Sequence, residues 1–374
     1  MGATRALIHL ERFRRNVRAV VHLTGRRVCA PVKADAYGHG APEIARAALE
    51  AGASCLAAAL VSEGAKLREN GLDAPILLLS QPLPCEIPEI LHYRLCPLVS
   101  DGDFAFELAR AAEAAGVRLP VHLKIDTGLG RLGCSPEEAP SLAARIEGLS
   151  PLELAGTATH LAVSDSADRE DRAYTEEQLV RFGKALDAMR SSGLDPGIVH
   201  AANSGGVMLH PESWFDMVRP GILLYGYDMT GAAGKTSGAG VLCPEPVMEL
   251  RTRIVLIRNV KKGESVSYGR IWRAPRDTVV AVIPAGYADG FPRLISGKNW
   301  EVGIRGRRYP LIGRVCMDQC MVDLGPDSNI SRWEEVSVFG GNAPDAGELA
   351  AEIGTIPYEI TCNISSRVPR VYIE

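Results

Sequence analysis

The sequence lacks several features that would place it in a specialised class of protein. No run reaches the roughly 20 apolar residues of a membrane span, and the start, MGATRALIHLERFRRN, is basic but has no apolar signal-peptide core. The net charge is only -4, with lysine and arginine scattered along the chain, which argues against nucleic-acid binding. Repeats and low-complexity tracts are also missing. We therefore expect a globular protein of the cytoplasm, with no membrane and no nucleic-acid partner.

Cysteine and histidine spacing likewise excludes two kinds of site. The nine cysteines are irregularly spaced without a C-x-x-C, and the closest pair is Cys316 and Cys320. An odd number without a framework favours a reducing compartment over a disulfide scaffold. No second histidine stands at metal-ligand spacing from His160, since His200 and His210 are too distant along the chain to form a helical pair. We expect no metal site.

A regular alternation of short apolar runs and helical segments occupies the region from residue 28 to about 225. Continuous apolar runs of this kind are typical of parallel strands buried on both faces. Eight such runs are present, at 28–32, 55–59, 75–80, 95–100, 120–125, 152–159, 197–202 and 217–226, and helices are expected at 41–52, 104–116, 136–149 and 176–193. The pattern predicts an α/β fold with a TIM-type (β/α)8 barrel over residues 11–235. A doubly wound open sheet has the same alternation of strands and helices, so this alternation alone leaves it as an alternative.

The residue composition and the expected secondary structure change after about residue 240. Segments such as VMELRTRIVLIRNV, DTVVAVIP and EEVSVFG are rich in β-branched residues and separated by glycine or proline, and 347–354 is a brief helix. These features predict a mostly β C-terminal domain over residues 236–374. The strand-like ALIHL (6–10) leads us to add residues 1–10 to that domain, because chain termini often lie close together.

Polar side chains follow the apolar runs at the point where each predicted strand ends. In a barrel, loops at the carboxyl ends of the strands converge on one site. We therefore expect the following residues to lie together: Lys33, Lys124, Asp126, Arg131, His160, Asn203, Ser204 and Arg219.

Lys33 is the most informative of these residues. It ends the run VCAPV and leads into ADAYGHG. A surface lysine paired with Asp35 is the plain interpretation. A desolvated lysine amine, however, loses its proton more readily and attacks carbonyls, which is the chemistry of a Schiff base with pyridoxal phosphate. The glycine-containing loops NSGG (203–206) and RPGI (219–222) follow the seventh and eighth runs, where barrels often bind phosphate.

The segment GLGRLG (128–133) suggests a different function. It matches the G-x-G-x-x-G dinucleotide pattern, follows a predicted strand and precedes a predicted helix, and Glu153 stands at the spacing of the ribose-binding acid. Against a nicotinamide dehydrogenase, the segment belongs to the fifth βα unit and not the first. We interpret the glycines as turn residues around Arg131, whose guanidinium is suited to a substrate carboxylate.

Taken together, the segments resemble a known family. CAPVKADAYGHGA, HLKIDTGLGRLG, HAANSGG, MVRPGILLYG, VSYG, GYADGFPR, GRVCMDQCMVD and PYEITCNISSRVPR spread over the whole chain. They are similar to alanine racemase, a pyridoxal-phosphate enzyme of fold type III. The first and the CMDQ-containing segment carry most of the resemblance, because glycine turns alone are common.

The resemblance implies roles for particular residues. Lys33 would hold the cofactor and act as one base, and Tyr268 would be the opposite base, supplied by the partner chain of a homodimer with shared sites. Arg219 would face the pyridine nitrogen, Arg131 and Met317 would hold the substrate carboxylate, and Lys124 is a position often carbamylated in the family. His160 would link Tyr268 to Arg219. The remaining implied site residues are Tyr37, Asn203, Ser204, Gly221, Ile222 and Tyr358 around the cofactor, with Tyr287, Cys316 and Asp318 in support.

The implied reaction interconverts L- and D-alanine and supplies D-alanine for peptidoglycan. Racemisation needs a proton removed from one face of Cα and returned to the other, which two opposed bases provide. The alternatives are a broader serine racemase, a fold type III decarboxylase and a pyridoxal-phosphate carrier. Decarboxylases of this type place glutamate toward the pyridine nitrogen, where Arg219 stands, and carriers lack the β domain. Ser366 and Leu161 depart from the family pattern, in which tyrosine and phenylalanine are common.

Overall fold

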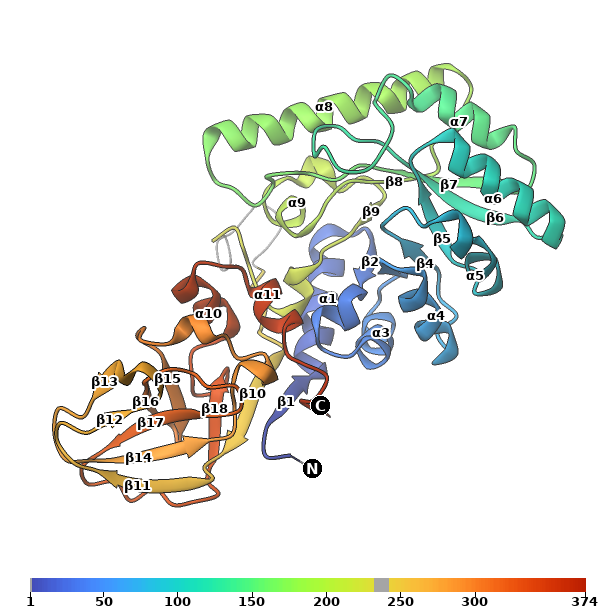
Figure 1. Cartoon of the computed structure of the whole chain (residues 1–374). Helices are drawn as coiled ribbons and strands as arrows, with labels where there is room; N and C mark the ends of the chain where they lie inside the picture. Colours follow the sequence, from blue (N-terminus) through green and yellow to red (C-terminus); the bar gives the residue numbers. More distant parts are fainter. Residues whose placement is uncertain (1, 232–241) are drawn as a thin grey trace. The chain divides into compact units, whose positions relative to one another are not determined.

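The computed structural model describes residues 2–231 and 242–374 (Figure 1). The chain forms two compact units. The barrel unit comprises residues 13–36 and 41–244, and the β unit comprises residues 1–12, 37–40 and 245–374. The predicted domain boundary between residues 235 and 236 lies outside the described residues. Among the helices that the structure describes, none is long and apolar enough to cross a membrane.

Eight parallel strands form the sheet of the barrel unit, in the order β8-β7-β6-β5-β4-β3-β2-β9. Their bounds are β2 Arg27–Pro31, β3 Cys55–Ala58, β4 Ile76–Leu78, β5 Cys96–Val99, β6 Leu119–Lys124, β7 Leu152–Ala158, β8 Ile198–His200 and β9 Met217–Val218. The ends of this sheet meet, because the N–H of Asp216 donates to the carbonyl of Val199 (3.0 Å) and the N–H of Arg219 donates to that of Ala202 (2.8 Å). The predicted eight-stranded barrel is confirmed.

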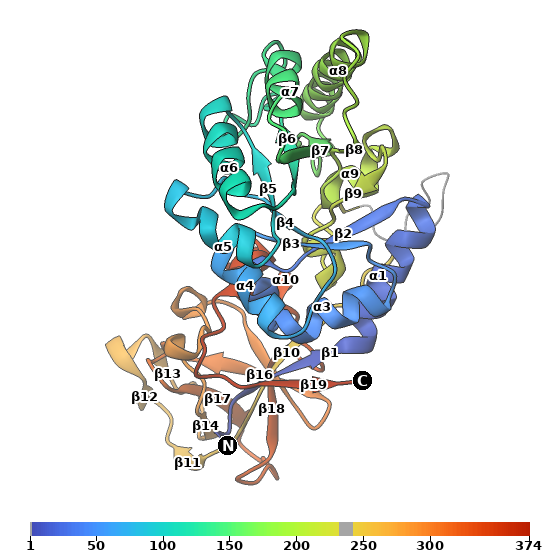
Figure 2. The ribbon, with the colours of Figure 1, turned by 90° about the vertical axis from the view of Figure 1, so that its right-hand side faces the viewer.

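Helices cover the outside of this barrel (Figure 2). They are α1 Leu10–Thr24, α3 Ala41–Glu50, α4 Val61–Glu69, α5 Ile87–His92, α6 Gly102–Ala115, α7 Ala139–Glu147, α8 Arg169–Ser191 and the short α9 Ser204–Leu209. Local sequence sets their ends. For example, α6 begins where the Asp101 carboxylate accepts from the N–H groups of Asp103 and Phe104, and it ends at Gly116, which takes the left-handed conformation.

The eighth apolar run differs from its prediction as a strand over 217–226. Only Met217 and Val218 pair with β2, and Ile222–Tyr225 form a 3-10 helix. Pro220 cannot donate a backbone hydrogen bond, so the ladder ends just before it. The run is nevertheless buried, and the Tyr225 hydroxyl donates to the Pro31 carbonyl at the end of β2 (2.8 Å).

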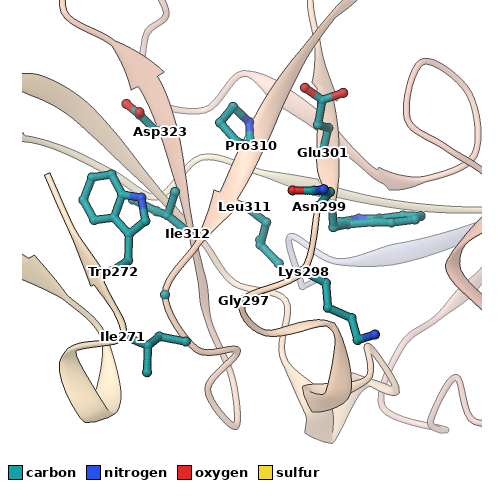
Figure 3. A pocket seen from close by; sticks show the side chains of 12 residues that line it. Ile271, Trp272, Gly297, Lys298, Asn299, Glu301, Pro310, Leu311, Ile312 and Asp323 are labelled. Carbon is teal, nitrogen blue, oxygen red and sulfur yellow. The ribbon is translucent and has the colours of Figure 1, made fainter. Parts of the chain in front are cut away.

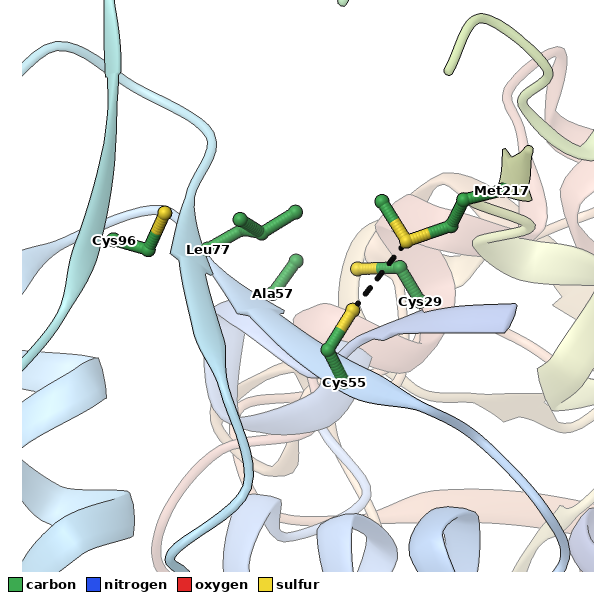
Figure 4. Close-up of a cluster of buried hydrophobic side chains, with 6 residues drawn as sticks. All are labelled: Cys29, Cys55, Ala57, Leu77, Cys96 and Met217. Carbon is green, nitrogen blue, oxygen red and sulfur yellow. Dashed lines mark hydrogen bonds between the residues drawn. The ribbon is translucent and has the colours of Figure 1, made fainter. Parts of the chain in front are cut away.

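Sulfur-containing side chains fill part of the barrel interior (Figure 4). Cys55 Sγ lies 3.6 Å from Met217 Sδ. Burial raises the pKa of the Cys96 thiol, and a hydrogen bond with Cys55 together with burial raises that of Cys29. The thiols of Cys29 and Cys96 are therefore neutral and pack as small apolar groups. The full cluster is Cys29, Cys55, Ala57, Leu77, Cys96 and Met217.

The β unit is built on a nine-stranded sheet, in the order β11-β14-β17-β16-β15-β18-β10-β1-β19. The strands are β1 Arg5–His9, β10 Met248–Arg253, β11 Leu256–Val260, β14 Thr278–Ile283, β15 Glu301–Ile304, β16 Arg307–Ile312, β17 Cys320–Gly325, β18 Glu335–Phe339 and β19 Arg370–Ile373. A second sheet pairs β12 (Ser265–Val266) with β13 (Trp272–Arg273), and two helices, α10 (Ala346–Ile353) and α11 (Pro357–Cys362), follow β18. The predicted mostly β domain is confirmed.

The N-terminal strand lies inside this sheet, between two strands from the other end of the chain. It pairs antiparallel with β10 and parallel with β19. Its residues alternate between buried and half-buried positions, and Ala6 and Ile8 are completely buried. The two ends of the chain therefore form neighbouring strands in one sheet (Figure 2).

A hollow of about 510 Å³ opens in the β unit between Trp272, Asn299 and Glu301 (Figure 3). Asp323 also lines it, but the Asp323 carboxylate already accepts from the Thr278 hydroxyl, from Arg276 and from the N–H of Gly325. The residues that line this hollow include none of the predicted site residues.

Candidate active site

Lys33 begins a tight turn directly after β2. The next four residues, Ala34, Asp35, Ala36 and Tyr37, have φ values of 50°, 51°, 55° and 53°. These residues thus form one left-handed helical turn without glycine. Left-handed helix costs an L-residue about 1–2 kcal/mol. Such a turn persists only where neighbouring groups hold it in place.

Side chains of helix α4 stabilise the left-handed turn at residues 34–37. Glu63 Oε1 accepts from the N–H of Ala34 at 2.6 Å, and Glu63 Oε2 accepts from the N–H of Ala59 at 2.8 Å. On the same helix, Lys66 Nζ lies 3.1 Å from Asp35 Oδ1, which also accepts from the N–H of Ala41. Glu63 therefore ties the residue after Lys33 to the loop that follows β3.

Arg219 lies buried after β9 and donates to groups on two neighbouring strands and loops. Its Nη2 donates to the Thr159 carbonyl (2.8 Å) and the Ala201 carbonyl (3.2 Å), and lies 3.4 Å from His160 Nδ1. Its Nη1 lies 2.6 Å from His200 Nδ1. Burial lowers the pKa of the guanidinium to about 10. The group is therefore still a cation at neutral pH.

Beneath Arg219, two imidazoles share a hydrogen bond inside the barrel. His200 Nε2 lies 2.7 Å from His122 Nδ1. Burial and then the charge of Arg219 lower the pKa of His122 to about 4 and that of His200 well below its usual range. Gly156 on β7 leaves room for them, since a Cβ there would stand 2.6 Å from the His122 ring. Both rings are neutral at physiological pH.

Positive charges gather around His160. Burial is the largest cause of its low pKa, followed by the charges of Arg219, Lys124, Arg131 and Lys33. The four cations come from the loops after β2, β6 and β9 and from the end of β6 itself. The structure thus brings these five predicted residues into one electrostatic environment at the carboxyl ends of the strands.

Lys124 is buried, with only 7% of its surface exposed, and its Nζ donates to the Ile125 carbonyl at 2.9 Å. Burial, followed by the charge of Arg219, lowers its pKa to about 7, although Asp126 acts in the opposite direction. A large share of the amine is therefore neutral and nucleophilic near pH 7.

The loop that carries Arg131 is organised by one carboxylate. Asp126 accepts from the N–H groups of Gly128 and Leu129 through Oδ1 and from the N–H of Arg131 through Oδ2, each at 2.9 Å. The loop then returns to β6, because the N–H of Cys134 donates to the Lys124 carbonyl (3.0 Å). The Arg131 side chain is exposed at the tip.

Because of this return, GLGRLG does not lead directly into the helix that follows it, in agreement with its interpretation as a turn around Arg131. Helix α7 begins only at Ala139, after the chain has paired with β6. A dinucleotide site places the glycine turn at the N-terminus of the next helix. The geometry here does not provide that arrangement, which removes the main support for a dehydrogenase.

The loops after β8 and β9 are joined by a hydroxyl group. Ser204 Oγ accepts from the N–H of Gly221 at 3.0 Å and from that of Leu223 at 3.3 Å. Asn203 caps α9 by accepting from the N–H of Gly206 (3.0 Å). Ile222 is wholly buried at the start of the 3-10 helix. The predicted phosphate-binding residues of the barrel unit therefore lie in two connected loops.

Tyr37 and Tyr358 belong to the β unit, where their rings lie 5.6 Å apart. Two glycines allow the chain to pass close to the C-terminal segments of this unit. A Cβ on Gly38 would lie 2.1 Å from the Thr361 carbonyl oxygen, and one on Gly40 would lie 1.9 Å from the Tyr372 hydroxyl. The GHG spacing in the sequence thus reflects backbone packing.

The other predicted residues of the β unit lie on its surface. Tyr268 is 70% exposed, Met317 54% and Tyr287 42%, and Cys316 is half-buried. Ser267, which precedes Tyr268, has a φ of 69° and its hydroxyl donates to the Arg314 carbonyl (2.7 Å). Two tyrosines and a methionine are thereby presented to the outside of this unit.

Hydrogen bonds join the short loop that carries Met317 to the short loop that carries Tyr287. The N–H of Tyr287 donates to the Cys316 carbonyl at 3.1 Å. Arg367 donates to Asp289 (2.7 Å) through Nε and to Asp318 (2.8 Å) through Nη2. Asp318, which was predicted as a supporting residue, therefore contacts Arg367 of the RVPR segment.

Sequence reasoning missed several of these residues. It considered His200 only as a metal ligand, and gave no role to Glu63 or Arg367. The pairing of His200 with His122 could have been predicted from the sequence. His122 lies on β6 and His200 on β8, and alternate strands of a barrel contribute side chains to the same interior layer. Glu63 had a weaker signal, since a Glu three residues after a helix start is a common cap. Among the described residues no group of histidines, cysteines and carboxylates suits a metal ion.

The fold and the site together define a (β/α)8 enzyme with a cluster of cations at the carboxyl ends of its strands. Two family models then match, "Alanine racemase, N-terminal domain" over residues 8–229 and "Alanine racemase, C-terminal domain" over residues 247–372. The chain belongs to the alanine racemase family, and it is an enzyme of the amino-acid racemase class.

Individual relatives cover essentially the whole chain. Alanine racemase of Treponema denticola is 47% identical, with 100% of this chain and 99% of that protein aligned. The structure of alanine racemase from Clostridium difficile 630 superposes with a TM-score of 0.91 at 34% identity, covering 100% of this chain and 96% of that one. Alanine racemase from Bartonella henselae with covalently bound pyridoxal phosphate gives 0.86 at 27% identity, with both chains covered completely.

Proposed function

We propose that this enzyme interconverts L- and D-alanine with pyridoxal 5'-phosphate bound to Lys33. The observation that carries the proposal is the group of four basic side chains around His160, one of which is Lys33, at the mouth of a barrel. The relatives named above are alanine racemases, and one holds the cofactor covalently. In a cell the product would be D-alanine for peptidoglycan, made in the cytoplasm.

The residues present fit this cofactor. Lys33, Arg131 and Arg219 bring positive charge to His160, and Lys124 adds part of another charge because a share of its amine is neutral. The carboxylate of Asp126 is occupied by backbone N–H groups of its own loop. An anionic ligand would balance that excess. Lys33 would hold the cofactor, Arg219 and His160 would lie beside it, and Asn203, Ser204, Gly221 and Ile222, with Tyr37 and Tyr358, would bind its phosphate.

Two bases of different type would move the proton. Bound pyridoxal phosphate withdraws electrons from the substrate Cα and so makes its proton acidic. The Lys33 amine would accept or deliver that proton on one face, and the partner subunit's Tyr268 would do so on the other. An acid and a base on opposite faces allow either enantiomer to be the substrate.

Arg219 would limit side reactions by keeping its own proton. A guanidinium that donates to Thr159, Ala201 and His200 is held in place on several sides, and it remains a cation. It would therefore not transfer a proton to the pyridine nitrogen, as a carboxylic acid would. This leaves a weaker electron sink and favours return of the proton to Cα.

The substrate carboxylate would be held by Arg131 and Met317. Lys124 would assist if its neutral amine takes up carbon dioxide, because a carbamate places a negative charge beside Arg131. The depressed pKa of about 7 supports this modification, since only the neutral amine reacts.

The active enzyme would be a homodimer in which each site combines residues of two chains. The exposure of Tyr268 and Met317 on the β unit supports the proposal, since tyrosine and methionine are enriched at protein interfaces. His160 would hydrogen bond to the partner subunit's Tyr268 and connect it to Arg219. Tyr287, Cys316 and Asp318 would support this face through their loop contacts.

A visible spectrum of purified protein, followed by a racemisation assay, tests the proposal. We expect cofactor absorbance in the wild type and in Lys184→Ala, a control at an exposed lysine, and none in Lys33→Ala. An unchanged spectrum in Lys33→Ala would refute the assignment. The assay should include serine and the release of carbon dioxide, because activity there would instead support a broader racemase or a decarboxylase.

A further inference from the structure

One face of α8 carries three polar side chains that reach the backbone of the site loops. Tyr174, Gln178 and Arg181 are spaced four and three residues apart, so they share a face of the helix. The Tyr174 hydroxyl donates to the Gly128 carbonyl at 2.7 Å. Arg181 Nη1 donates to the Thr127 carbonyl at 3.1 Å, while its Nη2 pairs with Glu177.

Gln178 joins two loops at once. Its Nε2 donates to Thr127 Oγ1 (3.3 Å) and to the His160 carbonyl (3.2 Å), and its Oε1 accepts from the N–H of Ala162 (2.9 Å). The side chain has no exposed surface. A buried amide is costly unless its polar atoms are bonded, and the bonds it makes are to the loops of Arg131 and His160.

The Arg131 loop is thus held through both kinds of backbone group. Its N–H groups donate to Asp126, as described above, and its carbonyl groups accept from α8. Gly128 is needed for this contact, because a Cβ there would lie 2.5 Å from the Tyr174 hydroxyl. A further bond links Thr127 Oγ1 to Thr159 Oγ1 (2.8 Å), next to His160.

Packing of α8 against the barrel does not account for these contacts. The buried apolar residues of its C-terminal half are Phe182, Ala185, Leu186 and Met189. The polar side chains contact loop backbone instead. We propose that Tyr174, Gln178 and Arg181 are positioning residues, which set Arg131 for the substrate carboxylate and hold His160 in register with it. This rests on the proposed function, in which Arg131 binds that carboxylate.

Steady-state kinetics of Tyr174→Phe and Arg181→Met test the proposal. Losing one such bond should raise KM for alanine about tenfold, the equivalent of roughly 1.4 kcal/mol, with kcat changed less than about threefold. Arg181→Lys keeps a donor and should recover part of the loss. Gln178→Leu should raise KM and also lower kcat, because it contacts the His160 loop. Cofactor absorbance should be unchanged in all four variants.

The matched control is Arg190→Met, on the same helix, where the guanidinium reaches Asp187 at 3.3 Å. It should leave KM and kcat unchanged. A variant that lowers the melting temperature without changing KM would show a merely structural role and overturn the proposal. A rise in KM together with loss of cofactor absorbance would also overturn it, because the effect would not be confined to the Arg131 loop.

Hydrogen exchange measured by mass spectrometry gives a readout that does not depend on activity. In Tyr174→Phe and Arg181→Met, amides of residues 127–131 should exchange faster, whereas those of 203–206 should not change. If the wild type neither binds pyridoxal phosphate nor racemises alanine, the proposed function fails, while this exchange result still reports on the contacts. Unchanged exchange at 127–131 would overturn the positioning role itself.

Discussion

Arg219 Nη1 lies 2.6 Å from His200 Nδ1, so the guanidinium donates to an imidazole that must be neutral. His200 in turn donates from Nε2 to His122 Nδ1. A proton added to either ring would break this order and set cations side by side in the barrel interior. The chain of three side chains therefore links the charge of Arg219 to the acid stability of the barrel.

We expect the protein to lose stability as the pH falls below about 6.5. The pKa of His122 is about 4 in the folded state against an ordinary 6.5, so between these values the unfolded chain binds more protons. The free energy of unfolding then falls with decreasing pH, by up to ~1.4 kcal/mol per pH unit for one such histidine. Urea unfolding midpoints of wild type and His122→Asn at pH 7.5 and 5.5 measure this. The acid loss should shrink in His122→Asn and persist in His92→Asn, at an exposed histidine; equal losses in all three would contradict the assignment.

Lys124 should make the free energy of unfolding depend on pH in the alkaline range. Its pKa is about 7 when folded and 10.5 ordinarily, so the unfolded chain again binds more protons in that window. The free energy of unfolding should therefore rise between pH 7 and 10, and Lys124→Met should flatten the rise. Urea unfolding at pH 7, 8.5 and 10 provides the measurement.

The same amine should take up carbon dioxide. Native mass spectra recorded in bicarbonate should show an added mass of one CO2, lost on acid unfolding and missing from Lys124→Met. Lys184→Met is the control, because that lysine is exposed. An adduct of equal size on Lys124→Met would assign the modification to another residue.

Glu63→Gln should weaken the turn after Lys33. An amide can accept through one atom only, so it cannot replace both carboxylate oxygens that now accept from Ala34 and Ala59. We expect kcat for alanine to fall about tenfold, for a loss of roughly 1.4 kcal/mol, and faster release of the cofactor, with KM within about twofold. Glu69→Gln makes the same change on the same helix, where the carboxylate accepts from Tyr93, and should behave as wild type. Identical kinetics in the two variants would argue against a role for Glu63.

Tyr268→Phe should impair proton removal from L-alanine more than from D-alanine, as measured by exchange in deuterated water. Mixing this variant with Lys33→Ala should restore activity to about a quarter of wild type. Random exchange makes half of the dimers mixed, and each mixed dimer has one intact site. No recovery, after subunit exchange has been verified by mass, would contradict a shared site.

The buried parallel strands of the barrel were within reach of the sequence, because apolar runs such as those at β3 and β6 mark them, whereas a doubly wound sheet was left open as the alternative arrangement of these strands. The convergence of Lys124, His160 and Arg219 followed from that fold. The left-handed turn at 34–37 did not, since Ala, Asp and Tyr have no local preference for it, and the contacts of Glu63 that support it come from another βα unit. The α8 face was hidden for a similar reason: Tyr174, Gln178 and Arg181 look like an ordinary polar surface until the loops beneath them are known.

The position of β1 between β10 and β19 has a consequence for biosynthesis. At roughly 5–20 residues per second, a ribosome needs roughly ten to fifty seconds after making β1 before β10 exists, and it makes β19, residues 370–373, later still. The apolar side chains of β1 must therefore stay without their sheet neighbours until both distant strands have been made, and a nascent chain that lacks residues 370–373 would leave β1 unpaired along one edge.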